Sequence, residues 1–238
     1  KLNETSLFRA ATFLGVERTG AVKSATYLVG RRPSLPVVSI SMKPQDFEDI
    51  HLQRTGRGRV SERPAFFEVF NPAGKRGVAT GFGLRLHGGA GRRGGMETKK
   101  SYRAYFRKAY GDGRLEHPII PHADIKDFDK LVFRANFGDG RSHGAYIRDQ
   151  VIRDLQIDMG GEASRGWYCV LLINGTDHGV YNVCERMDEE FFISHLGPGK
   201  YDVINTGETL LNGTREGWDS LKELVRSTDF SDDANFAK

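Results

Sequence analysis

The sequence predicts a mixed α+β fold with a mostly antiparallel sheet, and three features of the chain support this prediction. Several short segments alternate apolar and polar residues, as strands with one buried face do. Residues 144–159 instead repeat apolar residues at helical spacing, and two alternating runs meet at Gly175-Thr176-Asp177-His178 as in a hairpin. Because turns rather than helices separate most of the strands, the pattern favours α+β over a parallel sheet built from βαβ units.

The first half of the chain reads as strands separated by turn-forming residues. Residues 5–13 and 21–28 indicate two strands joined by a turn at 17–20, and the two prolines in 31–36 indicate a linker. The elements expected next are a strand at 37–41, a short helical or turn segment at 43–51, a basic loop at 52–63, a strand at 65–70 with a turn at 71–74, paired strands at 78–86 and 98–107, an extended connector at 117–121 and a strand at 131–134.

The second half contains the clearest helix, at 144–159, which Gly160-Gly161 should end. Its apolar positions recur three or four residues apart and predict an amphipathic helix; they are Tyr146, Ile147, Val151, Leu155 and Met159. The hairpin at 167–185 follows. After it we expect a short helix at 188–195, a brief strand at 203–204 and a final amphipathic helix at 215–226.

The composition excludes some classes of protein and permits others. The 238 residues, 38% hydrophobic and 28% charged, are typical of a globular chain with one large or two small domains. No run of 18 apolar residues is present that could span a membrane. The net charge of +4 is mildly basic, and arginines concentrated at 54–63 and 92–93 could attract phosphorylated or acidic partners. These stretches lack interleaved aromatic residues, which argues against nucleic-acid binding.

The two cysteines, Cys169 and Cys184, lie on either side of the hairpin turn. If Thr176-Asp177 formed a two-residue loop, the cysteines would lie opposite each other and within reach of a disulfide. A disulfide would imply an oxidising compartment. The alternative is a pair of buried thiols that pack as small apolar groups, and a one-residue shift of the strand register would favour it.

A segment rich in glycine and arginine, residues 81–106, carries the strongest functional signal. Gly89, Gly91 and Gly94 satisfy G-x-G-x-x-G, but a dinucleotide-binding fold requires this loop to open a helix, whereas residues 98–106 alternate like a strand. No G-x-x-x-x-G-K-[ST] string occurs. A glycine loop between two strands, followed by a lysine, is the arrangement of protein kinases. Lys100 follows Gly94 more closely than in ordinary kinases, and an arginine-rich hairpin without a ligand is the alternative.

Further motifs strengthen the nucleotide hypothesis, because together with the glycine loop they resemble the CotH spore-coat kinase family. The signatures of that family are a K-K-[SP]-[YF]-[RK] string after the loop, a helix that opens with [LI]-R-[ND], a strand pair around N-G, and an E-x-x-D string. In this sequence they are Lys99-Lys100-Ser101-Tyr102-Arg103, Ile147-Arg148-Asp149, Asn174-Gly175 through Gly179-Val180-Tyr181, and Glu185 to Asp188. The resemblance covers residues 36–226.

The resemblance implies a protein-kinase-like small lobe, with an antiparallel sheet and a central helix, followed by the start of the helical lobe. It implies that ATP and Mg²⁺ are the cofactors and that hydroxyls of secreted or surface proteins, such as those of a spore coat, accept the phosphate. Lys100 would contact the nucleotide phosphates, with Arg148 or Asp149 behind it. The segment Cys184-Glu185-Arg186 would be the hinge that runs past the adenine. The nucleotide-binding residues implied are Lys100, Gly88, Gly89, Gly91, Arg103, Arg148 and Glu185.

The resemblance also implies a division of the chain. Residues 1–30 look like the last strands of the small β-sandwich of the chitobiase C-terminal type that often precedes such domains, and residues 31–238 would form the kinase domain. The carboxylates that catalyse transfer and bind metal belong to later segments in this family, so we assign none of those roles here and expect that this chain alone does not turn over ATP. The alternative function is a non-catalytic interaction module of a coat or cell surface.

Overall fold

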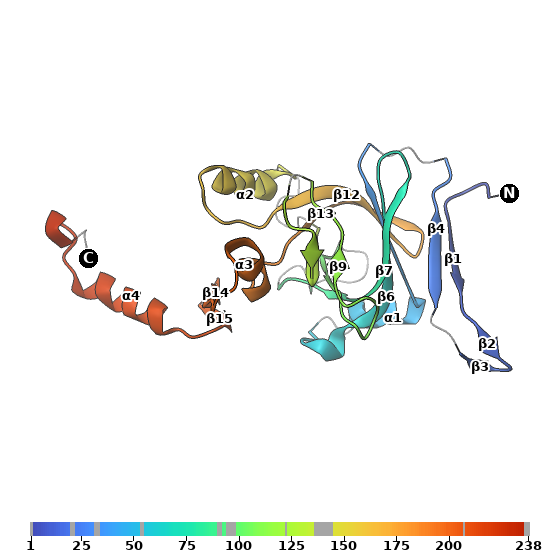
Figure 1. Cartoon of the computed structure of the whole chain (residues 1–238), viewed down its shortest axis with the longest axis horizontal. Helices are drawn as coiled ribbons and strands as arrows, with labels where there is room; N and C mark the ends of the chain where they lie inside the picture. Colours follow the sequence, from blue (N-terminus) through green and yellow to red (C-terminus); the bar gives the residue numbers. More distant parts are fainter. Residues whose placement is uncertain are drawn as a thin grey trace. The chain divides into compact units, whose positions relative to one another are not determined.

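The computed structural model describes residues 2–19, 22–30, 34–52, 55–89, 92–93, 99–121, 123–135, 145–206 and 208–235. The chain forms two compact units, Lys1–Arg186 and Met187–Lys238. Figure 1 colours the elements in chain order, from blue at the N-terminus to red at the C-terminus. Strands and helices are both well represented among the described residues, so the prediction of a mixed α+β fold is confirmed.

Seven strands of the first unit form a closed barrel in the order β11-β13-β12-β5-β6-β7-β8, and β8 pairs back to β11. Neighbouring strands are antiparallel except for β5 and β12, which run parallel. Closure removes the unpaired edges that an open sheet would expose. The strands are β5 (Val37–Met42), β6 (Arg63–Phe70), β7 (Arg76–Leu86), β8 (Tyr102–Tyr105), β11 (Lys130–Arg134), β12 (Gly166–Ile173) and β13 (Thr176–Cys184).

Aromatic side chains fill much of the barrel interior, because alternation along each strand turns every second residue inward. Phe67 of β6 is fully buried, and its ring meets those of Phe82, Phe106 and Phe133 edge-on at centroid distances of 5.8, 5.7 and 6.2 Å. Such pairs contribute about 0.5–1.5 kcal/mol each beyond the burial of their surface. The interior is therefore apolar, and the polar chemistry of these strands lies on their outer face.

The turn between β12 and β13 consists of Asn174 and Gly175 rather than of Thr176-Asp177 as predicted. Their φ values of 51° and 82° lie in the left-handed region that a type I′ turn requires at both central positions, which Asn-Gly adopts readily. The Asn174 side-chain oxygen also accepts a hydrogen bond from the Met42 N–H at 2.9 Å. The turn is thereby tied to the end of β5, the strand that pairs in parallel with β12.

The shifted turn separates the two cysteines. Cys169 lies opposite Tyr181, and Cys184 lies opposite Gly166, so the predicted facing pair is wrong. Both thiols are free and buried, as the alternative expected. Burial raises the pKa of both thiols above its ordinary value, which keeps them protonated and unreactive.

The N-terminal residues form the predicted two-stranded hairpin. Strands β1 (Ser6–Ala10) and β4 (Lys23–Tyr27) pair antiparallel, and the short strands β2 (Phe13–Leu14) and β3 (Glu17–Arg18) extend the pair. The tight turn lies at Gly15, with φ 62°, rather than at 17–20, because glycine adopts this left-handed conformation without strain.

A buried carboxylate joins this hairpin to the barrel. Glu68 on β6 is 1% exposed and accepts hydrogen bonds from the N–H and the hydroxyl of Thr26 at 2.9 and 2.8 Å. Its other oxygen pairs with Arg76 at 3.1 Å, and the Thr26 hydroxyl lies 2.8 Å from that of Ser39. Each polar group in this contact has a partner. The domain boundary predicted at residues 30 and 31 stays a prediction.

The remaining elements surround the barrel or belong to the second unit. Helix α1 (Pro44–Leu52) buries Ile50 and His51, and the His51 ring contacts the hydroxyl of Tyr102 at 3.1 Å. Helix α4 has no buried residue. The other elements are η1 (Arg59–Ser61), β9 (Leu115–Glu116), β10 (Asp127–Phe128), α2 (Arg148–Asp158), α3 (Glu189–Leu196), β14 (Val203–Asn205), β15 (Thr209–Asn212), α4 (Glu216–Ser227) and η3 (Asp233–Asn235).

Candidate functional site

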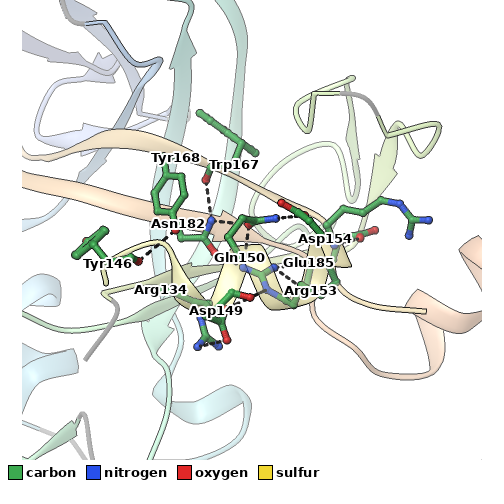
Figure 2. Close-up of polar contacts among 12 residues, drawn as sticks. Arg134, Tyr146, Asp149, Gln150, Arg153, Asp154, Trp167, Tyr168, Asn182 and Glu185 are labelled. Carbon is green, nitrogen blue, oxygen red and sulfur yellow. Dashed lines mark hydrogen bonds and ion pairs between the residues drawn. The ribbon is translucent and has the colours of Figure 1, made fainter. Parts of the chain in front are cut away.

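Helix α2 contacts the barrel through its polar side, as Figure 2 shows. The buried amide of Asn182 on β13 donates to the Gln150 side-chain oxygen at 2.9 Å. The Arg153 guanidinium donates to the same Gln150 oxygen at 2.9 Å, to the Asn182 oxygen, and to the Ser164 carbonyl at 2.6 Å. This network fixes both the position of the helix and its rotation about its own axis.

The apolar side of α2 is exposed instead. Val151 is 42%, Leu155 54% and Met159 81% exposed. Helical spacing correctly predicted the helix, and Gly160, with φ 84°, ends it as expected. The spacing did not predict which side contacts the barrel, because hydrogen bonds to the buried Asn182 decide that orientation.

An ion pair connects the third strand of the glycine-loop sheet to this helix. Arg134, the last residue of β11, lies 3.1 Å from an Asp149 oxygen in the first turn of α2, and Arg153 lies 3.0 Å from the other oxygen of that carboxylate (Figure 2). Arg134 lies opposite Asn182 in the sheet, so the ion pair and the amide network are adjacent. Asp149 is thereby held between two guanidinium groups.

The predicted glycine loop does join two paired strands, β7 and β8. The N–H of His87 continues the pairing by donating to the Ser101 carbonyl at 2.8 Å. Gly88 has φ 92°, and a side chain at Gly89 would meet no atom within 4 Å. The backbone is therefore open at the base of the loop, where a ligand could approach it. Gly91 and Gly94 lie outside the described residues.

Arginines gather on the outer face of this hairpin. Arg85 of β7 and Arg103 of β8 lie directly opposite each other. Both donate to the hydroxyl of Tyr105, Arg103 at 2.9 Å, and the Arg85 guanidinium carbon lies 4.6 Å from the centre of the Tyr105 ring. Like charges directly opposite each other destabilise a sheet, so this pair works against folding. A neighbouring carboxylate, Glu62, is bound by Arg107 through two contacts of 3.2 Å.

His87 lies within this group of cations and is neutral. Its Nδ1 is 2.7 Å from Arg103, and because a guanidinium only donates, Nδ1 must accept and the proton must be on Nε2. Burial, and after it the charges of Arg103, Arg186, Arg134 and Arg92, lower the pKa of His87 to about 3. Burial and neighbouring arginines likewise lower the pKa of Arg92 to about 10.

The predicted site residues do not all meet at one place. Arg103 and Gly88 are brought together through His87. Lys100 is 3% exposed, and its ammonium donates to the Arg93 carbonyl at 2.5 Å. The side chain of the preceding lysine, Lys99, instead donates to the Tyr146 hydroxyl at 2.9 Å. The contact of Lys100 with phosphates stays a prediction.

The other two predicted residues have defined positions in the structure. Arg148 is the first residue of α2, and its N–H donates to the Ala145 carbonyl at 3.0 Å. Glu185 is buried directly after β13, and its carboxylate accepts a hydrogen bond from the Arg165 N–H at 2.8 Å. This contact braces the start of β12. The nucleotide-binding roles predicted for Arg148 and Glu185 stay predictions.

Sequence reasoning missed Arg85, His87 and Arg134 as site residues. A signal was present, because Arg85 and His87 alternate with the inward-facing Leu84 and Leu86, and therefore project from the outer face of β7 together. What the sequence alone did not reveal is the register that places Arg85 opposite Arg103.

The described residues do not fit a magnesium site. Nowhere in the described part of the chain do three or more histidine, cysteine, aspartate or glutamate side chains come close enough together to hold a metal ion. Magnesium prefers carboxylate oxygens, and the Asp149 carboxylate is taken up by two arginines. In the same described ranges, no helix combines the length and apolar character needed to cross a membrane.

Comparison with known proteins identifies one family. A family model described as CotH kinase protein matches residues 84–236, which is more than half of the chain. No curated protein matches the chain. The matched range begins within β7 and includes Arg85, His87, Arg103, Arg134 and Asp149.

Proposed function

Because the chain belongs to the CotH kinase protein family, we propose that it holds the nucleotide of an ATP-dependent phosphotransferase. Kinase family membership implies nucleotide binding and the use of ATP. The acceptors that we propose, on the family resemblance, are hydroxyl groups of secreted or surface proteins. The structure supports the nucleotide-holding role through one ion pair and the order of the elements around it.

The order of elements supports this role. A glycine-loop hairpin (β7 and β8) is followed by a third strand (β11), a helix (α2) and two more strands (β12 and β13). In protein kinases the third strand carries a lysine that contacts the nucleotide phosphates and pairs with a glutamate of the following helix. We propose that Arg134 and Asp149, 3.1 Å apart, take these two positions, and this ion pair is the observation that carries the proposal.

The nucleotide would lie on the outer face of β7, β8 and β11, the same face that α2 contacts. There its phosphates would meet Arg134, Arg103 and the backbone of Gly88 and Gly89. A carboxylate behind Arg134 orients the guanidinium, so the cation is fixed before the nucleotide arrives and loses little side-chain entropy on binding. Arginine can also bind two phosphate oxygens at once, which a lysine cannot do with the same geometry.

A titration of the full chain with ATP tests this role. Arg134→Gln should weaken ATP binding by about 10- to 100-fold, because a charge-assisted hydrogen bond is lost. Arg114→Gln is the matched control, since Arg114 forms an ion pair with Asp127 at 2.6 Å that is partly exposed. Thermal unfolding of both variants verifies that each is folded. Unchanged ATP affinity in folded Arg134→Gln would show that Arg134 does not hold phosphate.

One observation favours the alternative, a non-catalytic interaction module. The buried Lys100 ammonium donates to the backbone of the loop rather than facing the outer surface. If its predicted role is correct, Lys100→Ala should weaken ATP binding about as much as Arg134→Gln does. If wild-type chain binds no ATP at all, the interaction module is the better function. A phosphorylation assay tests the separate expectation that this chain alone does not turn over ATP, and robust transfer would contradict it.

A further inference from the structure

A cavity of about 420 Å³ lies beside helix α2, within the size range of ligand pockets, roughly 300–1,000 Å³. Its wall comes from the connector at 120–121, the last two turns of α2 and residues 165–167, where β12 begins. Ile120 and Trp167 in this wall are only 2% and 7% exposed, so part of the wall is apolar. None of the described residues proposed to hold the nucleotide lines this cavity.

Two carboxylates lie at the edge of this cavity without a cation from the chain. Asp154 and Asp158 are one turn apart on α2, and both are exposed. Asp154 accepts a hydrogen bond from the Gln150 amide at 2.6 Å (Figure 2), and Asp158 has no hydrogen-bond or ion-pair partner among the described residues. Like charges one turn apart weaken a helix, and the helix dipole disfavours a carboxylate at the last position of α2. Both carboxylates are therefore placed where the helix alone would not favour them.

The cation in the wall of the cavity is already paired. Among the described residues of the wall that cation is Arg165, and its guanidinium lies 3.7 Å from Glu162. Asp154 and Asp158 therefore leave the cavity with an excess of negative charge. The indole N–H of Trp167 is buried and has no acceptor among the described residues, so the wall also contains a polar group that the chain leaves unpaired.

Exposed apolar side chains continue from the edge of the cavity along α2. Val151 and Leu155 lie three residues before Asp154 and Asp158, and side chains at this spacing are neighbours on a helix. Exposed apolar surface beside polar residues is typical of a protein-binding site. A small cation would fill the cavity and leave this surface uncovered, whereas a peptide would cover both.

We propose that the cavity binds an arginine side chain of a partner protein. The guanidinium would pair with Asp154 and Asp158, because its five N–H groups can serve two carboxylates at once. The aliphatic stem of the arginine would cover the apolar wall, and an apolar residue next to that arginine would pack on Val151 and Leu155. Arginine is enriched among the anchor residues of protein interfaces. The inference goes beyond the proposed function, because it involves no nucleotide.

Fluorescence anisotropy with a labelled peptide and the full chain, at physiological ionic strength, tests the inference. The probe is a capped peptide of alternating leucine and arginine, and the control peptide carries the neutral analogue citrulline in place of each arginine. The arginine peptide should bind about tenfold more tightly or better, because citrulline keeps the shape but has no charge to pair with the carboxylates. Propylguanidine, a guanidinium without a peptide, should bind at least about tenfold more weakly than the arginine peptide.

Two substitutions on α2 and one matched control locate the binding site. Asp158→Arg should weaken binding of the arginine peptide by about tenfold or more, because it removes one carboxylate and places a competing guanidinium one turn from Asp154. Leu155→Ser should weaken it by about 3- to 10-fold, because apolar contact is lost. Glu48→Arg should bind like the wild type, since Glu48 is an exposed carboxylate on helix α1 outside the cavity. Thermal unfolding verifies that each variant is folded.

An NMR titration that follows the indole N–H of Trp167 gives a readout independent of affinity. The chain has two tryptophans, so Trp218→Phe leaves the Trp167 signal alone in the indole region. The arginine peptide should shift this signal, because Trp167 lines the cavity.

Three outcomes would overturn the inference. These are equal binding of the arginine and citrulline peptides, unchanged binding by folded Asp158→Arg, and a Trp167 signal that the bound peptide leaves in place. Propylguanidine binding as tight as that of the peptide would overturn the assignment to a protein partner. Affinity for ATP enters none of these measurements, so this inference and the proposed function can fail separately.

Discussion

Two groups of charge on the same barrel, one buried and one half-buried, differ in how they are balanced. On one side Glu68 is surrounded by matching donors from Thr26 and Arg76. On the other side Arg85 and Arg103 face each other with no carboxylate between them. Burial of an ion is tolerated when partners replace its water. The contacts of Glu68 therefore stabilise the fold, whereas the facing charges of Arg85 and Arg103 destabilise it.

The largest expected change in stability should follow from removing the Glu68 carboxylate. Glu68→Ala should lower the free energy of unfolding by about 2–4 kcal/mol, because the N–H and hydroxyl of Thr26 lose their acceptor. Urea unfolding measures the change. Asp127→Ala, which removes an exposed ion pair with Arg114, should cost less than about 1 kcal/mol. Similar losses in the two variants would show that the Glu68 contact is not structural.

A smaller effect should follow from lowering the pH. The folded state keeps His87 neutral, with a pKa of about 3, because burial and then the charges of Arg103, Arg186, Arg134 and Arg92 oppose its protonation. The unfolded state binds a proton below its ordinary pKa of about 6.5. The unfolded state therefore binds more protons between these values, and stability falls as the pH is lowered through that window.

Between pH 7 and pH 5 the loss from His87 should be about 1–2 kcal/mol. Urea unfolding of the wild-type chain and of His87→Gln at both pH values isolates it, since the variant lacks the titrating ring. The interpretation fails if the two proteins lose equal stability over this range.

The smallest effect should have the opposite sign. Arg103→Gln removes a like-charge pair and leaves an amide that can still donate to His87, so it should raise the free energy of unfolding by about 0.5–1 kcal/mol. The same variant should bind ATP more weakly, because the phosphates of the proposed nucleotide meet Arg103. A variant that is more stable and binds less would be direct evidence that these charges serve a ligand. A loss of stability comparable to that of Glu68→Ala would refute this view.

Local features of the fold were predictable from the sequence because local chemistry decides them. The strands follow from alternation, α2 from helical spacing, and its end from Gly160-Gly161. Asn174-Gly175 favours its own turn by local chemistry, although the sequence pattern predicts the loop two residues later, at Thr176-Asp177. The closed barrel was not predictable in this way, because the parallel pairing of β5 and β12 joins segments far apart in the chain.

The candidate site likewise contains residues that the sequence predicts and residues that only the structure reveals. Gly88, Gly89 and Arg103 could be identified because they lie within one continuous motif. The roles proposed for Arg134 and Asp149 required the structure, because their proximity depends on how α2 docks, and that depends on hydrogen bonds to Asn182 rather than on the apolar pattern. Periodicity predicts which residues share a side of a helix, but it does not predict which side contacts the barrel.

The parallel contact of β5 with β12 also sets the order in which the barrel can assemble. Val38 pairs with Leu171, and joining segments roughly 130 residues apart is slow because of the entropy of closing so long a loop. During synthesis β5, β6, β7 and β8 emerge well before β12 does. Until it arrives, one side of β5 has no partner, and its exposed backbone can pair with other chains. A growing chain is therefore open to misassociation until β12 has been made.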